Sequence, residues 1–197
     1  MARELTTDEI NQVLSLIATK RHATRDKAIF MLALYSGLTI KEVVSLKISQ
    51  VLTTAGLISE QIVLGESYKK PNRRRIVYLN KKVRITVYDY LCERFNTTDL
   101  LPLLLTDTQR PLFTTQKSIN RGFTSHTLTG HFCELMAEAG VPDASAYSLR
   151  KSFAHLITAK VLSPKFIETM CDTEDKYALV RSIETNPVTL KKAINLI

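Results

Sequence analysis

The sequence lacks the features that mark several classes of protein, namely paired cysteines, a metal-binding spacing and long apolar runs. Its 197 residues include three cysteines, an odd number, and they lie far apart in the chain: Cys92, Cys133 and Cys171. This pattern forms neither a disulfide framework nor a metal-binding spacing, and it predicts reduced, mostly buried thiols. No apolar run is long enough to span a bilayer, and the first residues carry an early acid and no apolar signal core. We therefore expect a cytoplasmic protein without a metal site.

Acidic residues are missing from one segment, between Ser67 and Tyr88, which holds eight basic residues. The formal charge of the whole chain is +8, so this segment alone matches the net excess. Clustered basic residues attract polyanions and give salt-dependent phosphate binding, which favours a nucleic-acid partner over a merely solvated surface. An acidic membrane surface is less favoured, because the segment has the pattern of a hairpin and lacks that of an amphipathic helix.

Apolar periodicity and capping signals predict a mainly α domain with one small antiparallel β-sheet, an α+β class. Capping boxes at Thr6–Glu9 and Thr39–Glu42 begin two helices, and Gly37 ends the helix between them. The β-branched stretches 58–64 and 76–79 flank a basic tip, as in a β-hairpin, and 97–115 is predicted to be a loop-rich connection. The remaining helices are predicted to begin near Arg25, Lys82, Ser125, Arg150, Pro164 and Asn186. We expect residues 1–197 to form a single domain.

Several stretches, taken in order, resemble the tyrosine recombinases, or phage integrase family. Residues 25–43 resemble the first conserved box of that family, and Pro111-Leu112-Phe113 with the helix that follows resembles its middle section. The stretch AYSLRKSFA, residues 146–154, resembles the second box. The likeness covers about residues 8–183. It implies the fold of a tyrosine-recombinase catalytic domain, without the N-terminal core-binding domain that most members carry.

The resemblance also implies a chemistry on double-stranded DNA. In the family a tyrosine attacks a DNA phosphate and forms a covalent 3′-phosphotyrosyl link, while two arginines hold the non-bridging oxygens. A lysine on a β-hairpin protonates the leaving oxygen, and histidines assist. Neither a metal nor any other cofactor is needed. The expected location is the cytoplasm, in association with the nucleoid.

Some of the family's site positions keep a suitable residue. Arg150 stands at the second arginine, and a guanidinium offers a rigid two-pronged donor to phosphate. Tyr147 stands where a histidine usually opens the second box, and Lys151 where another histidine is frequent. Lys69 and Lys70 are both candidates for the hairpin lysine. The alternative interpretation of Arg150 is a surface residue paired with a carboxylate, and that of the lysines is a solvated turn.

Other site positions carry residues that lack the required chemistry. Thr39 stands where the first arginine is expected, and its part as the N-cap partner of Glu42 is complete without a functional role. Thr173 replaces a histidine, and Ser182 falls near the position of the nucleophile. Tyr177 is the nearest phenol, five residues early, a shift of about 7 Å along a helix. We expect Tyr177 to be a packing residue.

We therefore expect a DNA-binding protein that is defective in strand cleavage and acts as an accessory or regulatory factor. One alternative is an active recombinase or integrase that uses Tyr177 as a displaced nucleophile. The other is a protein-interaction module, in which a C-terminal helix over residues 186–197 docks onto a second copy or a partner recombinase. The residues expected to contact DNA are Lys69, Lys70, Arg73, Arg74, Arg75, Arg121, Arg150 and Lys151.

Overall fold

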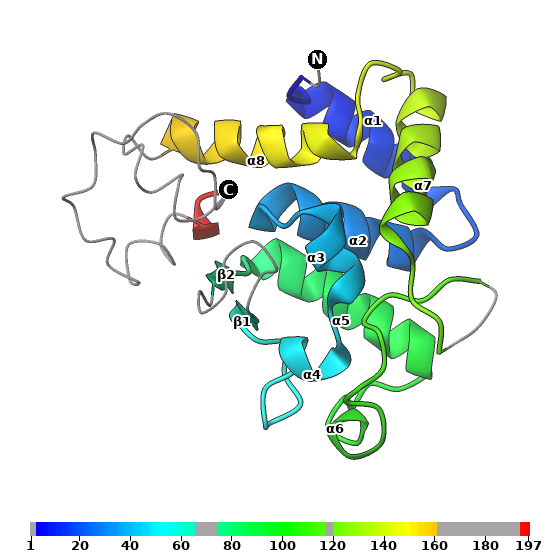
Figure 1. Cartoon of the computed structure of the whole chain (residues 1–197), viewed down its shortest axis with the longest axis vertical. Coiled ribbons are helices and arrows are strands. Elements are labelled where there is room, and N and C mark those ends of the chain that lie inside the picture. The colour runs from blue at the N-terminus through cyan, green and yellow to red at the C-terminus, as the bar shows by residue number, and fades with distance from the viewer. Residues whose placement is uncertain (1–2, 66–74, 117–119, 161–193) are drawn as a thin grey trace.

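A computed structural model of the chain describes residues 3–65, 75–116, 120–160 and 194–197 (Figure 1). Within these ranges the fold is mainly helical, with one two-stranded antiparallel sheet, as predicted. The helices are α1 (Thr7–Ala18), α2 (Ala23–Ser36), α3 (Ile40–Ser45), α4 (Ile48–Val51), α5 (Lys81–Phe95), α6 (Leu103–Thr106), α7 (Ser125–Glu138) and α8 (Ala146–Lys160). The strands are β1 (Gln61–Leu64) and β2 (Arg75–Tyr78). No helix among the described residues has the length and apolarity needed to cross a membrane.

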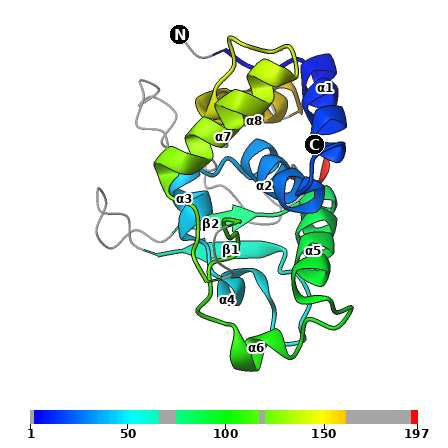
Figure 2. The same cartoon turned by 90° about the vertical axis from the view of Figure 1, so that its right-hand side faces the viewer.

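Helix α2 is the centre of the domain. Every residue from Ala28 to Leu34 is buried, which is the pattern of a helix that is apolar on all sides and is surrounded by others. Helices α1, α3, α5 and α8 all contact it. Figures 1 and 2 show α1, α7 and α8 gathered at one end of the molecule, and α4 and α6 at the other.

Local capping chemistry sets the ends of the helices. Both predicted capping boxes are present: Thr6 with Glu9 begins α1, and Thr39 with Glu42 begins α3. Gly37 follows α2 with a φ of 66°, the left-handed conformation that glycine adopts without strain. A turn of only a few residues therefore joins α2 to α3.

The sheet is the predicted hairpin, but β1 is shorter than the predicted stretch 58–64, and β2 begins one residue before the predicted stretch 76–79. Val63 pairs with Ile76 in the antiparallel register, and both side chains are largely exposed. The alternate positions, Ile62, Leu64 and Val77, face the core. The hairpin tip lies outside the described residues.

The start of α8 corrects one prediction. The helix begins at Ala146, so Arg150 lies in its second turn and does not open it. The Ser148 hydroxyl accepts a hydrogen bond of 3.1 Å from the Ser145 backbone N–H, which is one half of a capping box at the start of α8. The short helices α4 and α6 were also not predicted, and Cys133 is exposed, contrary to expectation.

The last four residues pack on their own chain. Ile194 and Ile197 are buried in a small cluster with Tyr78, Phe153 and Ile157. In addition, Lys82 Nζ donates a hydrogen bond of 2.7 Å to the Ile197 carbonyl. The end of the predicted 186–197 helix therefore covers this chain's own core, and its docking onto another chain stays a prediction.

Candidate nucleic-acid interface

Arg150 links α8 to the turn between α2 and α3. Its Nη1 donates a hydrogen bond of 3.1 Å to the Gly37 carbonyl, and the guanidinium is partly buried. The same turn touches α8 a second time, because the Phe153 ring lies directly against Gly37. Among the residues that the structure describes, the Gly37 carbonyl is the recorded partner of Arg150, and a pairing with a carboxylate stays the predicted alternative. A backbone carbonyl anchors the side chain and leaves its positive charge uncompensated by that contact.

Two other predicted site residues share this side of α8. Tyr147 lies three residues before Arg150 and four residues before Lys151. At this spacing the three side chains lie on one face of α8. The Tyr147 ring is 60% exposed, an unusual position for an aromatic side chain. The face therefore presents a phenol, a guanidinium and an ammonium group together, all of which donate hydrogen bonds to phosphate oxygens.

Thr39 lies on the same turn and is bound to a carboxylate. The Glu42 Oε2 atom accepts hydrogen bonds from the Thr39 N–H at 2.7 Å and from the Thr39 hydroxyl at 2.8 Å. The other oxygen, Oε1, accepts from Arg75 Nη2 at 2.7 Å. Arg75, a predicted DNA-contacting residue at the start of β2, is thereby brought to the turn that Arg150 also touches.

Tyr35 lies in the last turn of α2, two residues before Gly37. Tyr35 packs against the cluster that holds Phe153, and the Lys82 ammonium lies 5.4 Å from the centre of its ring. Burial raises the pKa of Tyr35, so its phenol stays protonated at neutral pH. Tyr35 therefore acts here as a packing group.

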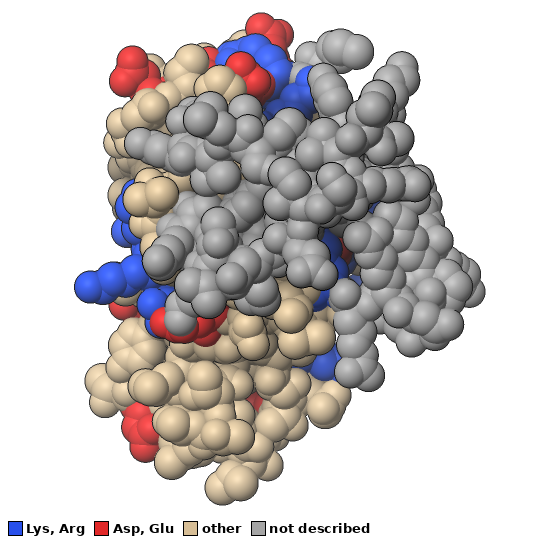
Figure 3. All heavy atoms as spheres, turned by 90° about the vertical axis from the view of Figure 1, so that its left-hand side faces the viewer, with Lys and Arg blue, Asp and Glu red and all other residues tan. Residues whose placement is uncertain are grey.

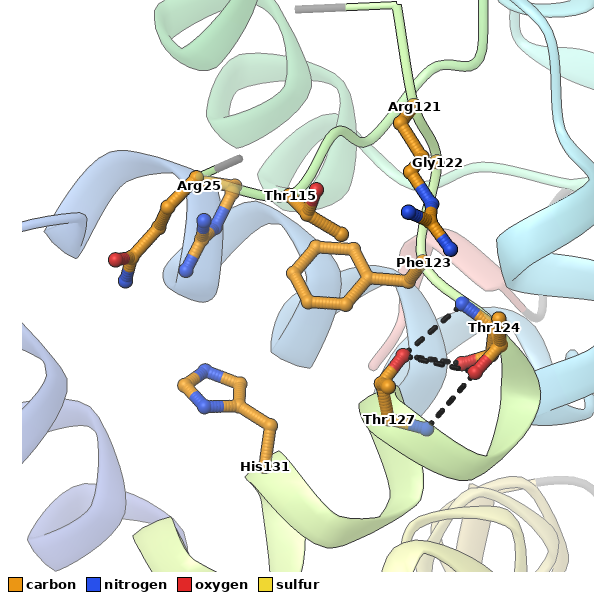
Figure 4. A pocket seen from close by; sticks show the side chains of 9 residues that line it. Arg25, Thr115, Arg121, Gly122, Phe123, Thr124, Thr127 and His131 are labelled. Atoms are coloured by element: carbon orange, nitrogen blue, oxygen red, sulfur yellow. Dashed lines mark hydrogen bonds between the residues drawn. The ribbon is translucent and has the colours of Figure 1, made fainter. Parts of the chain in front are cut away.

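Arg121 is the predicted residue that the structure places elsewhere. It lines a pocket of about 300 Å³ beside the N-terminus of α7, together with Arg25, Phe123 and His131 (Figure 4). Arg25 is in the first turn of α2, whereas Gly37 follows its last turn. The 14 residues of α2 span about 21 Å, so the pocket and the Arg150 face lie at opposite ends of this helix.

A buried charge cluster underlies this pocket and was not foreseen from the sequence. Arg25 pairs with Asp26 at 2.8 Å, and His131 Nε2 lies 3.0 Å from the other carboxylate oxygen. The Arg25 guanidinium also stacks 5.1 Å from the centre of the Phe123 ring. Burial by itself would raise the pKa of Asp26, but the His131 imidazole at 3.0 Å and the charge of Arg25 outweigh it and lower the pKa. The sequence feature that could have indicated this cluster is the pair Arg25-Asp26 in the first turn of the buried helix α2.

Charge is distributed unevenly over the face that carries the hairpin and the end of α8. In Figure 3 the visible Lys and Arg side chains lie in the middle and upper parts of this face. The lower part, over α4 and α6, is mostly uncharged.

Several predicted site residues lie outside the described part of the chain, and their places stay predictions: Lys69, Lys70, Arg73, Arg74, Thr173, Tyr177 and Ser182. Among the described residues, no group of three or more His, Cys, Asp or Glu side chains is arranged to hold a metal ion. Apart from Arg121, the predicted site residues that the structure describes lie on α8, on the α2–α3 turn and on β2.

Comparison with known proteins identifies the family. The family model described as "Phage integrase family" matches residues 3–180. This chain belongs to the phage integrase family. Its likeness to the XerA recombinase has a TM-score of 0.70 at 20% identity and covers 98% of this chain and 64% of that one. For the XerH site-specific recombinase bound to its difH substrate in a pre-cleavage complex, the TM-score is 0.64 at 18% identity, over 98% of this chain and 50% of that one.

A curated relative is also similar in sequence. Transposase A from transposon Tn554 of Staphylococcus aureus is 30% identical over 97 residues, which are 48% of this chain and 26% of the transposase. The aligned region is thus about a quarter of the length of the transposase. The structural likenesses, at these low identities, establish that the fold is that of the tyrosine-recombinase catalytic domain.

Proposed function

We propose that this phage integrase-type domain binds double-stranded DNA and does not cleave it. The observation that carries the proposal is the anchoring of Arg150 to the Gly37 carbonyl. This contact holds a guanidinium on the face shared with Tyr147 and Lys151, beside a turn that carries threonine at position 39. A fixed, partly exposed guanidinium beside further donors is suited to grip a DNA phosphate in its ground state.

DNA as the partner is supported by charge and by likeness. The chain carries a formal charge of +8, and the XerH recombinase to which it is similar was captured on a DNA substrate. Phosphate neutralisation by Lys and Arg supplies most sequence-independent DNA affinity. A duplex is therefore the partner that fits the basic hairpin and the α8 face together.

Loss of cleavage is proposed from the chemistry of the substituted positions. Thr39, at the position of the family's first arginine, is committed to capping α3 through Glu42 and carries no charge. Removing a single donor that stabilises transition-state charge typically costs on the order of 10²–10³ in rate. With Ser182 near the nucleophile position as well, no covalent intermediate is expected, and an accessory or regulatory role on DNA follows.

The two alternative functions require different arrangements of the chain. An active recombinase requires Tyr177 to reach the phosphate held by Arg150. A protein-interaction module requires the C-terminal segment to expose an apolar face, yet Ile194 and Ile197 are buried against Phe153 and Tyr78. This burial favours the DNA-binding proposal over the interaction module.

The salt dependence of duplex binding tests the proposal. We expect fluorescence anisotropy with a labelled duplex to show binding at low salt that weakens steeply as salt rises. The logarithm of the binding constant should fall linearly with the logarithm of salt concentration, by about 0.9 for each phosphate contacted, so four contacts give a slope of about −3.6. Absence of binding at low salt, or binding that is insensitive to salt, would refute the proposal.

A further inference from the structure

We propose that the pocket beside the N-terminus of α7 binds a mononucleotide, with its phosphate on Arg25 and Arg121 and its planar base against Phe123. The inference goes beyond the proposed function and does not depend on duplex binding. The pocket has a volume of about 300 Å³, which lies within the range of small-molecule sites. It lies at the other end of α2 from the turn that Arg150 contacts.

Arg25 is a buried cation that keeps one nitrogen for a ligand. Its side chain is only 8% exposed. Its Nε and Nη2 atoms each lie 2.8 Å from Asp26 Oδ1, and its guanidinium covers the Phe123 ring. These contacts fix the plane of the guanidinium, whereas no group among the described residues accepts a hydrogen bond from Nη1. A guanidinium held in this way is preorganised for a phosphate oxygen.

Arg121 and Thr115 supply further donors from the connection that precedes α7. The two residues are neighbours, because the Thr115 N–H donates a hydrogen bond of 2.9 Å to the Arg121 carbonyl. The Arg121 side chain is exposed and lines the pocket. The Thr115 hydroxyl is buried and has no hydrogen-bond partner in the described part of the chain. Because a buried polar group without a partner is costly, a ligand oxygen at this point would stabilise it.

The charge of the pocket favours an anion. None of the residues that line it carries a carboxylate. Asp26, beneath the pocket, is 3% exposed and is held by Arg25 and His131. The pocket also adjoins the first turn of α7, where the positive end of the helix macrodipole attracts negative charge. A phosphate monoester therefore fits the donors better than a neutral or cationic group.

An aromatic wall adds a place for a planar ring. The rings of Phe123 and His131 are inclined by 25°, with their centres 6.4 Å apart. Figure 4 shows these two rings and the Arg25 guanidinium directed toward one another at the pocket. Stacking of a base on an aromatic side chain is tolerant of sequence, because every base has a π-face. A phosphate joined to a base thus matches the lining more fully than a phosphate alone.

A purely structural role explains only part of this arrangement. The cluster of Arg25, Asp26 and His131 joins α2 to α7 and would stabilise the domain without any ligand. That role accounts neither for the buried hydroxyl of Thr115 without a partner nor for the cavity that Arg121 lines. A bound nucleotide accounts for both.

Calorimetric titration of the full chain with adenosine 5′-monophosphate (AMP), adenosine and inorganic phosphate tests the site. We expect saturable binding of AMP, about tenfold weaker binding of phosphate, which lacks the base, and no measurable binding of adenosine, which lacks the charge. Arg121→Ala should weaken AMP binding about tenfold. Arg110→Ala removes an equal charge beside α6 and should change it by no more than about twofold.

Two sources of the nucleotide group are distinguished by a short single strand with either a phosphate or a hydroxyl at its 5′ end. Saturable AMP binding assigns the pocket to a free nucleotide. Preference for the phosphorylated strand without AMP binding, lost in Arg121→Ala, assigns it to a strand end. The inference is refuted if neither probe binds at millimolar concentration, or if Arg121→Ala and Arg110→Ala behave alike.

A second variant keeps the test decisive if Arg121→Ala unfolds, which thermal melting monitors. Phe123→Leu keeps an apolar side chain but removes the ring, so AMP should bind about as weakly as inorganic phosphate. Unchanged AMP affinity in Phe123→Leu would refute the stacking of the base. None of these outcomes alters the duplex titration, so the nucleotide site and the proposed function fail or stand separately.

Discussion

Gly37→Ala is expected to lower the free energy of unfolding by about 2–5 kcal/mol, the largest stability loss that we predict for one added methyl group. A Cβ atom at this position would lie 2.5 Å from Cε1 of Phe153, whose ring is fully buried. The backbone φ of 66° would also be strained for any residue with a Cβ atom. Overpacking and backbone strain therefore act together.

Urea unfolding followed by circular dichroism measures this loss, and α7 offers a matched control. Gly130 lies inside α7, is exposed, and has nothing within 4 Å of an added Cβ. Gly130→Ala should stabilise the protein by about 0.5–1 kcal/mol, because alanine favours the helix. If Gly37→Ala were no less stable than the unmodified chain, the close approach of α8 to the α2–α3 turn would be wrong, and with it the position of Arg150.

Arg150→Ala is expected to weaken duplex binding by about 10- to 100-fold at moderate salt, the largest effect on binding. Hydrogen bonds to charged groups contribute about 1.5–3 kcal/mol, and 1.4 kcal/mol corresponds to a factor of ten. The salt slope should fall by about one unit. Arg150→Lys should lie between the two, because it keeps the charge and loses the two-pronged geometry.

The control for Arg150→Ala removes an equal charge at the end of the molecule that carries α6. Arg110 pairs with Asp107, next to α6, far from the turn that Arg150 contacts. We expect Arg110→Ala to change duplex affinity by no more than about twofold. Equal losses for the two variants would show that only net charge matters, and the assignment of Arg150 as a specific phosphate ligand would then be withdrawn.

Local signals allowed much of the fold to be predicted from the sequence. The capping boxes at Thr6 and Thr39 and the glycine stop at position 37 depend on residues within four positions of one another, so the sequence pattern contains the whole interaction. The hairpin follows from the same kind of local alternation. The start of α8 was misplaced because Ser148 caps it through a less distinctive half of the same motif.

The site was only partly predictable, because its decisive contacts join distant segments. Arg150 was singled out from its sequence context, but its bond to Gly37 spans 113 residues. Likewise, the pairing of Arg75 with Glu42 depends on how β2 lies against α3, and the cluster of Asp26 with His131 depends on the packing of α2 against α7. No local pattern encodes these distances. Arg121 was grouped with Arg150 for its charge alone, and the fold places it at the other end of α2.

The measurement that tests the central claim most directly uses one nicked suicide duplex, run on a native gel and on a denaturing gel. We predict a retarded complex on the native gel and no protein–DNA adduct on the denaturing gel. A covalent adduct that disappears in Tyr177→Phe would contradict the account and establish an active recombinase with a displaced nucleophile. Failure to retard the duplex at low salt would contradict it equally.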